Sequence, residues 1–170
     1  MKNVIFFLAF LCLLQHSVWG QEYNRTTYPE GSETPMLIGA CNRDAFALPE
    51  FQSWFDKEYE SYVPDGAFMS ALKDMSIENL SFTIVLGTWC PDSRREVPRF
   101  FRIIDDLGIP DEQIRMLSLD RNKSIPGEDI SELKVYFVPT FILHRNGIEL
   151  GRIVEMPENT IEADILDMLN

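Results

Sequence analysis

The chain has 170 residues, of which 45% are hydrophobic, and this length and composition suit one hydrophobic core rather than two. It carries 15 basic and 27 acidic residues, which gives a formal net charge of −12. Because nucleic acids bind basic surfaces, this charge argues against a nucleic-acid partner.

The first 20 residues have the pattern of a secretory signal peptide. Lys2 precedes an unbroken apolar run over residues 4–14, and Val18-Trp19-Gly20 places small or β-branched residues where a signal peptidase cleaves. The run is shorter than the roughly 20 residues that a membrane-spanning helix needs. We therefore expect an exported protein, periplasmic or otherwise extracytoplasmic, with no stable membrane insertion after cleavage.

Residues 21–40 are rich in Thr, Glu, Gly and Pro with little apolar periodicity, which predicts an extended amino-terminal arm. Residues 41–170 are expected to form one domain that starts with a helical extension, 44–75. In this extension, aromatic residues at steps of three and four predict an amphipathic helix over 49–62. A second short helix is predicted over 67–75.

The first predicted strand of the domain is 81–86, which is β-branched and nearly all apolar. That composition is typical of a central strand covered by helices on both faces. Pro91 suits the first position of a helix that runs to about Leu107, and Pro98 lies inside this helix. The next strand is predicted over 114–119.

The last part of the chain predicts a short helix near 129–133, then a hairpin and a final helix. Asn146-Gly147 is a strong turn signal between predicted strands at 140–144 and 149–154. An amphipathic pattern follows Pro157. This order of elements predicts an α/β fold with a central mixed sheet flanked by helices.

Two segments of the sequence carry a recognisable pattern. Gly87-Thr88-Trp89-Cys90-Pro91-Asp92-Ser93 ends a buried strand and opens a helix, and Val138-Pro139-Thr140 opens the strand before the hairpin. Both segments resemble the thioredoxin superfamily. Their joint occurrence is more specific than either alone. The resemblance covers about Phe82 to the C-terminus and implies a thioredoxin-like fold in which a cis-proline loop at Pro139 faces Cys90.

The sequence departs from this family at its active-site motif. The family's two cysteines, separated by two residues, appear here as Cys90 followed by Ser93, so the resolving thiol is missing. The family's buried acid in the preceding strand also has no counterpart in 83–86.

Cys90 is the candidate catalytic nucleophile, because the N–H groups at a helix start favour a thiolate. Arg94 and Arg95 would add to this effect, and Asp92 would oppose it. A thiolate attacks a disulfide to form a mixed disulfide, and a hydroxyl at Ser93 cannot resolve it.

Release of the mixed disulfide has three open routes: a second thiol on the substrate, a small-molecule thiol, or Cys41 as the resolving thiol. The alternative for Cys41 is a buried, idle thiol. Ser93 is expected either to hydrogen-bond the thiolate as a catalytic residue or to be a small residue at the helix start.

Substrate binding is expected beside the nucleophile, at Trp89, Pro91, Val138 and Pro139. A cis bond at Pro139 would let the backbone of Val138 pair with an extended peptide and would keep metals away from the thiol. The alternative for Pro139 is a turn-shaping residue without a ligand. Trp89 either contacts the substrate, which the resemblance favours, or packs on the sheet edge.

These observations favour monothiol thiol–disulfide exchange, of reductase or isomerase type, on disulfide- or thiol-containing proteins or small thiols. No cofactor is expected, and no metal, because His144 lacks a cluster of partner ligands. A redox-inactive binding module with a thioredoxin fold is the second interpretation. A peroxide-reactive thiol is the third, although the expected threonine-rich peroxidase signature is absent.

Overall fold

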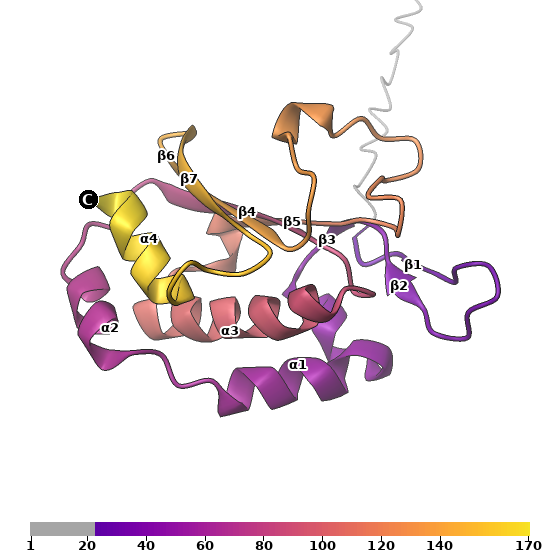
Figure 1. Cartoon of the computed structure of the whole chain (residues 1–170), viewed down its shortest axis with the longest axis horizontal. Helices are drawn as coiled ribbons and strands as arrows, with labels where there is room; N and C mark the ends of the chain where they lie inside the picture. Colours follow the sequence, from indigo (N-terminus) through magenta and orange to yellow (C-terminus); the bar gives the residue numbers. More distant parts are fainter. Residues whose placement is uncertain (1–22) are drawn as a thin grey trace, which may run out of the picture.

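The structure is a computed structural model that describes residues 23–170, so the expected signal peptide, residues 1–20, lies outside the described range. A five-stranded sheet lies above a layer of helices (Figure 1). Within the described range, no helix has the length and apolar character needed to cross a membrane.

The elements follow the predicted order, with additions near the N-terminus. The strands are β1 (Thr26–Thr27), β2 (Met36–Leu37), β3 (Gly39–Cys41), β4 (Leu80–Leu86), β5 (Ile114–Ser118), β6 (Thr140–Arg145) and β7 (Ile148–Val154). The α-helices are α1 (Pro49–Ser61), α2 (Gly66–Lys73), α3 (Pro91–Leu107) and α4 (Ile161–Leu169). Short 3-10 helices are η1 (Arg43–Ala47), η2 (Asp111–Gln113) and η3 (Ser131–Leu133).

The sheet has the order β3-β5-β4-β6-β7, and β4 is its central strand. β4 and β5 are parallel and are joined by α3, whereas the β3–β5, β4–β6 and β6–β7 pairs are antiparallel. β4 is buried along almost its whole length, as its apolar sequence predicts. The predicted α/β fold with a mixed sheet is confirmed.

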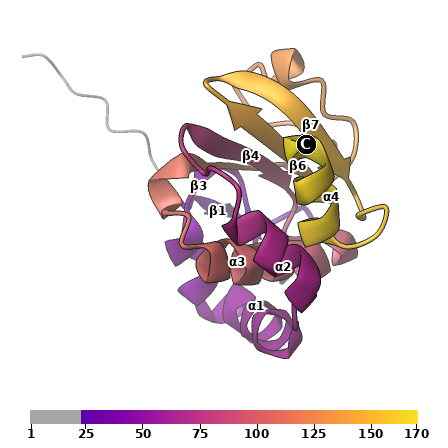
Figure 2. The same ribbon diagram turned by 90° about the vertical axis from the view of Figure 1, so that its left-hand side faces the viewer.

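All four α-helices lie on one side of the sheet and contribute to the larger hydrophobic core; α1 packs on α3, which separates it from the sheet (Figure 1). Figure 2 shows α4 beside β7 and α2, closing this layer at the C-terminus. Aromatic side chains dominate the packing between the helical extension and α3: Phe46, Phe51, Phe55, Phe100 and Phe101.

The second face of the sheet is covered by the irregular segment 119–139, so the prediction of helices on both faces is wrong. The short helix predicted near 129–133 is only η3. η3 is capped by Lys134, whose backbone is in the left-handed region with a φ of 49°, so the helix stops after one turn. Packing of this segment on the sheet forms the smaller core that contains Cys90.

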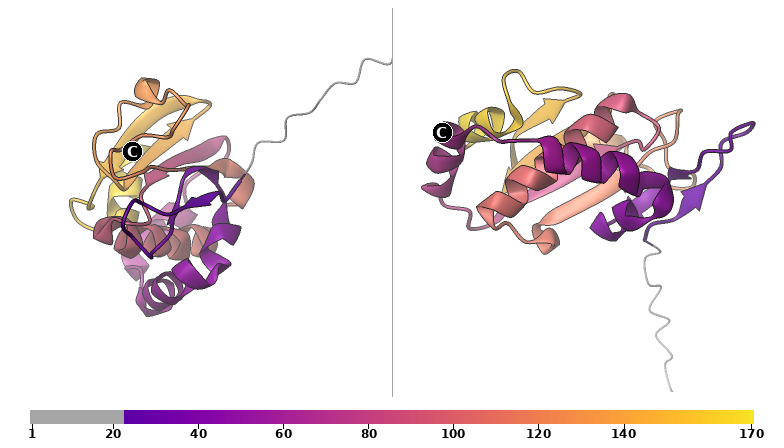
Figure 3. Two further views of the ribbon diagram at one scale, coloured as in Figure 1. Left: turned by 90° about the vertical axis from the view of Figure 1, so that its right-hand side faces the viewer. Right: turned by 90° about the horizontal axis from the view of Figure 1, so that it is seen from below.

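The arm predicted over residues 21–40 ends inside the core. Leu37 is fully buried; its N–H donates to Thr88 Oγ1 at 3.1 Å, and its carbonyl oxygen accepts from Ser118 Oγ at 2.9 Å. The hairpin of β1 and β2 projects beyond the helices (Figure 3), and β3 becomes an edge strand of the main sheet. The run Met36-Leu37-Ile38 is apolar but too short to show a strand period.

Candidate functional site

The loop 87–90 carries the candidate nucleophile from the end of β4 to the start of α3. Cys90 is the N-cap residue of α3, Pro91 is at its first position, and the Cys90 N–H donates to the Gly87 carbonyl at 2.8 Å. Thr88, fully buried, is bonded from two sides: its hydroxyl accepts from Leu37, and its carbonyl accepts from Arg94 Nε at 2.6 Å. The position of Cys90 is therefore set by the start of α3 and by the hydrogen bonds that hold the loop before it.

The structure brings the two resemblance-bearing segments into contact. The Cys90 thiol donates a hydrogen bond to the carbonyl oxygen of Val138, with 3.2 Å between Sγ and oxygen. The peptide bond between Val138 and Pro139 is cis. Cys90 is only 7% exposed, and the hydrogen bond uses the proton on sulfur. Formation of the nucleophilic thiolate therefore breaks this bond.

One backbone donor in the proline loop remains open. The carbonyl of Phe137 accepts from Thr140 Oγ1 at 2.7 Å, and the carbonyl of Pro139 accepts from the Glu155 N–H at 2.7 Å. The N–H of Val138 donates to none of the described residues. An extended peptide that supplies a carbonyl oxygen would satisfy it.

Ser93 lies one turn into α3 and is fully buried. Its hydroxyl oxygen accepts a hydrogen bond from the Gly87 N–H at 3.1 Å, and no hydrogen bond joins Ser93 to Cys90 among the described residues. Ser93 thus bonds the backbone just after β4 and does not bond the candidate nucleophile.

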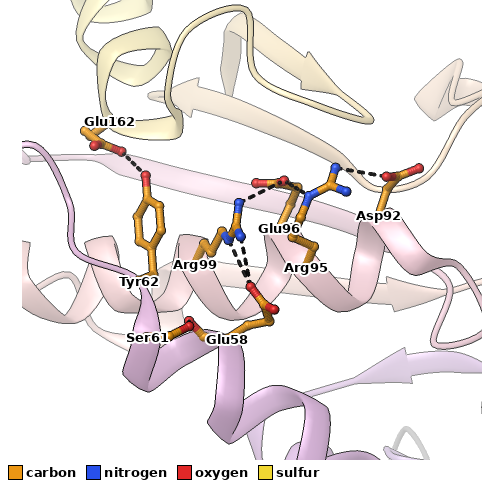
Figure 4. Close-up of polar contacts among 8 residues, drawn as sticks. All are labelled: Glu58, Ser61, Tyr62, Asp92, Arg95, Glu96, Arg99 and Glu162. Carbon is orange, nitrogen blue, oxygen red and sulfur yellow. Dashed lines mark hydrogen bonds and ion pairs between the residues drawn. The ribbon is translucent and has the colours of Figure 1, made fainter.

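The charged residues of the first turns of α3 pair with one another rather than with Cys90. Arg95 donates hydrogen bonds to Asp92 at 2.9 Å and to Glu96 at 2.5 Å (Figure 4), and the bond to Glu96 is the main reason that the pKa of Arg95 is raised. Arg94 bonds the Thr88 carbonyl, and its guanidinium lies 5.9 Å from the ring of Trp54. The contribution of Arg94 to the site is therefore to hold the loop.

Trp89 is half-buried and packs over the ends of β4 and β5. Its indole N–H donates to the Leu119 carbonyl at 2.8 Å, and the guanidinium of Arg121 lies 5.5 Å from its ring. Contact between Trp89 and a substrate stays a prediction.

The structure does not bring Cys41 to Cys90. Cys41 is in the core on the helical face, whereas Cys90 belongs to the core on the opposite face, and both thiols are free. Burial raises the pKa of the Cys41 thiol to about 12, and a hydrogen bond with the Ser118 backbone lowers it only in part.

Two buried glutamates were not predicted from the sequence. Glu96 of α3 is 3% exposed, and Glu162 of α4 is 1% exposed and accepts from the Tyr62 hydroxyl at 2.8 Å (Figure 4). Burial, and then this bond, raise the pKa of Tyr62. The partners of Glu162, the Tyr62 hydroxyl and the Asp65 N–H, are far away along the chain, so no local pattern marks it as buried. Glu96 pairs with Arg95 and Arg99 of its own helix, as an exposed glutamate also would.

No metal site is found among residues 23–170: no group of three or more His, Cys, Asp or Glu side chains is placed to hold an ion. The charged side chains of α3 form ion pairs within the helix and with Glu58 of α1.

No protein-family model and no curated protein matches the chain. Among solved structures, a protein of unknown function from Pseudomonas aeruginosa aligns with a TM-score of 0.56 and 16% identity, covering 77% of this chain and 92% of that one. An HIV epitope scaffold aligns with a TM-score of 0.55 and 18% identity over the same shares. Trxlp from Edwardsiella tarda aligns with a TM-score of 0.38 and 21% identity, covering 64% of this chain and 95% of that one.

The chain has a thioredoxin-like fold. This rests on the mixed sheet, the helix that follows β4, the proline loop before β6, and the terminal hairpin and helix. The first two alignments show a shared fold only, because both identities are low. The thioredoxin-like fold predicted from the sequence is confirmed, and its activity is a separate question.

Proposed function

We propose that this is an exported thioredoxin-like protein that exchanges thiols and disulfides through Cys90 as a single nucleophile. The observation that carries the proposal is the contact between Cys90 Sγ and the Val138 carbonyl, 3.2 Å long, in front of the cis Val138–Pro139 bond. This contact unites a cysteine at a helix start with a loop that has a free backbone donor. Cysteines at helix starts are common nucleophiles.

The proposed reaction is a pair of exchange steps. Cys90 loses its proton to solvent, and the thiolate attacks one sulfur of a disulfide; a bond forms between that sulfur and Cys90, and the other sulfur leaves as a thiolate. A second thiol then attacks the mixed disulfide and restores Cys90. If that thiol belongs to the substrate, the net reaction is isomerisation. If it is a small thiol, Cys90 is released and the small thiol stays disulfide-bonded to the substrate sulfur. A second small thiol then displaces this sulfur, so that the substrate is reduced by two electrons and two small thiols are oxidised to their disulfide.

The protein surface beside Cys90 supports an extended polypeptide substrate. The open N–H of Val138 would pair with a substrate carbonyl. Tyr136 and Phe137, which precede Val138, are 71% and 48% exposed and would contact substrate side chains. The proposed binding residues are therefore Val138 and Pro139, with Pro91 bordering the thiol.

Turnover of hydroxyethyl disulfide with glutathione as the reductant tests the proposal. We expect the full chain and a Cys41→Ser variant to turn over at similar rates, and a Cys90→Ser variant to lose turnover. Equal rates for the Cys90→Ser variant and the unmodified protein, or loss of turnover in Cys41→Ser alone, would contradict exchange at a single thiol.

One observation favours a second function, that of a binding module without redox turnover. Cys90 is 7% exposed, and its proton is engaged by Val138, so the resting sulfur is poorly placed to react. In that case the proline loop binds an extended peptide, and Cys90→Ser binds the same peptide as the unmodified chain does. Absence of turnover together with retained peptide binding in Cys90→Ser would favour this second function.

A further inference from the structure

The two edges of the main sheet differ. At the β3 edge, residues of the amino-terminal hairpin add further backbone bonds: the Asn24 N–H donates to the Ala40 carbonyl at 3.1 Å, and the Ile38 N–H donates to the Arg25 carbonyl at 2.9 Å. At the other edge, β7 pairs only with β6. β7 is therefore the open edge of the sheet in the described part of the chain.

In the second half of β7, some backbone N–H and carbonyl groups point away from β6 and toward solvent. The Glu155 N–H donates to the Pro139 carbonyl, and hydrogen-bonded pairs alternate along an antiparallel ladder. The N–H and carbonyl of Arg152 and the N–H of Val154 therefore point away from β6. Val154 is 41% exposed, so an added strand would find both backbone partners and an apolar contact.

A groove of about 350 Å³ runs between this strand and α4, which lie side by side in Figure 2. Its apolar lining is Ile153, Val154, Met156 and Met168. Met168 packs directly on the backbone of Gly151, where an added Cβ would lie 2.7 Å from Met168 Sδ. Methionine side chains adapt to different partners, which suits a binding groove.

The rim of the groove is acidic. Glu158, Asp164 and Asp167 line it, and residues 153–170 contain five acidic and no basic residues. Arg152 does not offset this charge, because its guanidinium makes two 2.7 Å hydrogen bonds to Glu149. A second copy of this chain, with a net charge of −12, is a poor occupant because like charges repel.

We infer that the β7–α4 groove binds an extended, lysine- or arginine-bearing segment of a partner protein, which adds to the sheet as a strand beside β7. The backbone of that segment pairs with Arg152 and Val154. The aliphatic stems of its basic side chains lie on Met156 and Met168, and their charged ends reach Asp167 and Glu158. This binding does not involve Cys90 and is independent of the proposed exchange reaction.

A fluorescein-labelled nonapeptide of alternating lysine and valine, titrated with the full chain and followed by anisotropy, tests the inference. We expect saturable binding, and binding at least about tenfold weaker when alternate peptide nitrogens are methylated, since methylation removes the ladder donors. Hydrogen exchange at the Arg152 and Val154 amides is expected to slow on binding. Equal affinity of the methylated peptide would show attraction by charge alone and would overturn the inference.

Variants locate the binding site. Asp167→Lys and, separately, Gly151→Ala, which displaces Met168, are each expected to weaken binding about tenfold. Glu112→Lys, an exposed change of the same charge on η2, is expected to leave affinity within about twofold. Equal losses in Asp167→Lys and Glu112→Lys would overturn the inference, as would sedimentation showing that copies of this chain pair through β7.

Discussion

The indole ring of Trp89 lies against the backbone of Gly87: a Cβ added to Gly87 would be 2.7 Å from Trp89 Nε1. Gly87→Ala must therefore displace the ring and break its hydrogen bond to the Leu119 carbonyl. We expect this substitution to lower the free energy of unfolding by about 1–3 kcal/mol and to shift tryptophan emission. Urea unfolding followed by fluorescence measures both effects.

Gly66→Ala is the matched control for this substitution. An added Cβ at Gly66, the first residue of α2, meets no atom within 4 Å. The free energy of unfolding of Gly66→Ala is expected to stay within about 0.5 kcal/mol of that of the unmodified protein. Equal stability of Gly87→Ala and Gly66→Ala would show that Trp89 does not occupy this position.

Ser93→Ala is expected to destabilise the protein even though it removes a single oxygen atom. The Gly87 N–H would remain buried without its acceptor, which costs about 1–3 kcal/mol. Ser61→Ala is the control, because Ser61 is exposed and makes only a long bond to the Glu58 carbonyl, 3.4 Å. Thermal unfolding compares the two variants, and a loss no larger in Ser93→Ala than in Ser61→Ala would contradict this role of Ser93.

Asp105 links α3 to the N-terminal part of the domain and makes stability depend on pH. It accepts two hydrogen bonds from Arg43 and one from the Tyr59 hydroxyl at 2.6 Å. Partial burial tends to raise the pKa of Asp105, but the bonds from Arg43 and Tyr59 outweigh it and lower the pKa. The stabilisation is therefore present above the unfolded-state pKa of about 3.9 and is lost as pH falls through the lower folded-state value.

Asp105→Asn is thus expected to cost about 1 kcal/mol at pH 7, and the difference from the unmodified protein is expected to shrink below about pH 4. Urea unfolding between pH 7 and pH 2.5 measures this difference. Asp106→Asn, which removes a single 3.4 Å ion pair with Arg102, is the control and should cost less. A difference for Asp105→Asn that stays constant down to pH 2.5 would contradict the ion-pair account.

Cys41 is expected to resist alkylation in the folded protein. With a pKa of about 12, about one thiol in ten thousand is ionised at pH 8, and the side chain is 3% exposed. Mass spectrometry after iodoacetamide treatment should therefore find label on Cys41 only when urea unfolds the chain. Labelling of Cys41 in the native state, at the rate found in urea, would restore it as a candidate resolving thiol.

The long elements of the fold could be predicted because each carries its own local signal. Pro91 and the apolar stripe that follows it define α3, and Asn146-Gly147 defines the β6–β7 turn. The amino-terminal strands could not be predicted, since Leu37 is held by Thr88 and Ser118, more than fifty residues away in the chain. The short helix predicted near 129–133 is reduced to η3, and the segment 119–139 around it is ordered by packing on the sheet rather than by a local helix signal.

The residues of the candidate site could be predicted from the sequence, but most of their hydrogen bonds could not. The resemblance predicted that Cys90 faces Val138 and Pro139, and the structure has Cys90 in contact with the Val138 carbonyl. It could not show that Arg94 holds the Thr88 carbonyl or that Ser93 accepts from Gly87, since both bonds depend on the path of the loop. Charges adjacent in sequence to a thiol need not reach it in space.

The most direct test of the account is to mix the full chain with excess glutathione disulfide, quench with acid, and locate the mixed disulfide by intact and peptide mass spectrometry. The account predicts one glutathione per chain, attached to Cys90, in the unmodified protein and in Cys41→Ser, and none in Cys90→Ser. Glutathione on Cys41, or an unmodified Cys90 after prolonged incubation of a folded protein, would contradict exchange through Cys90.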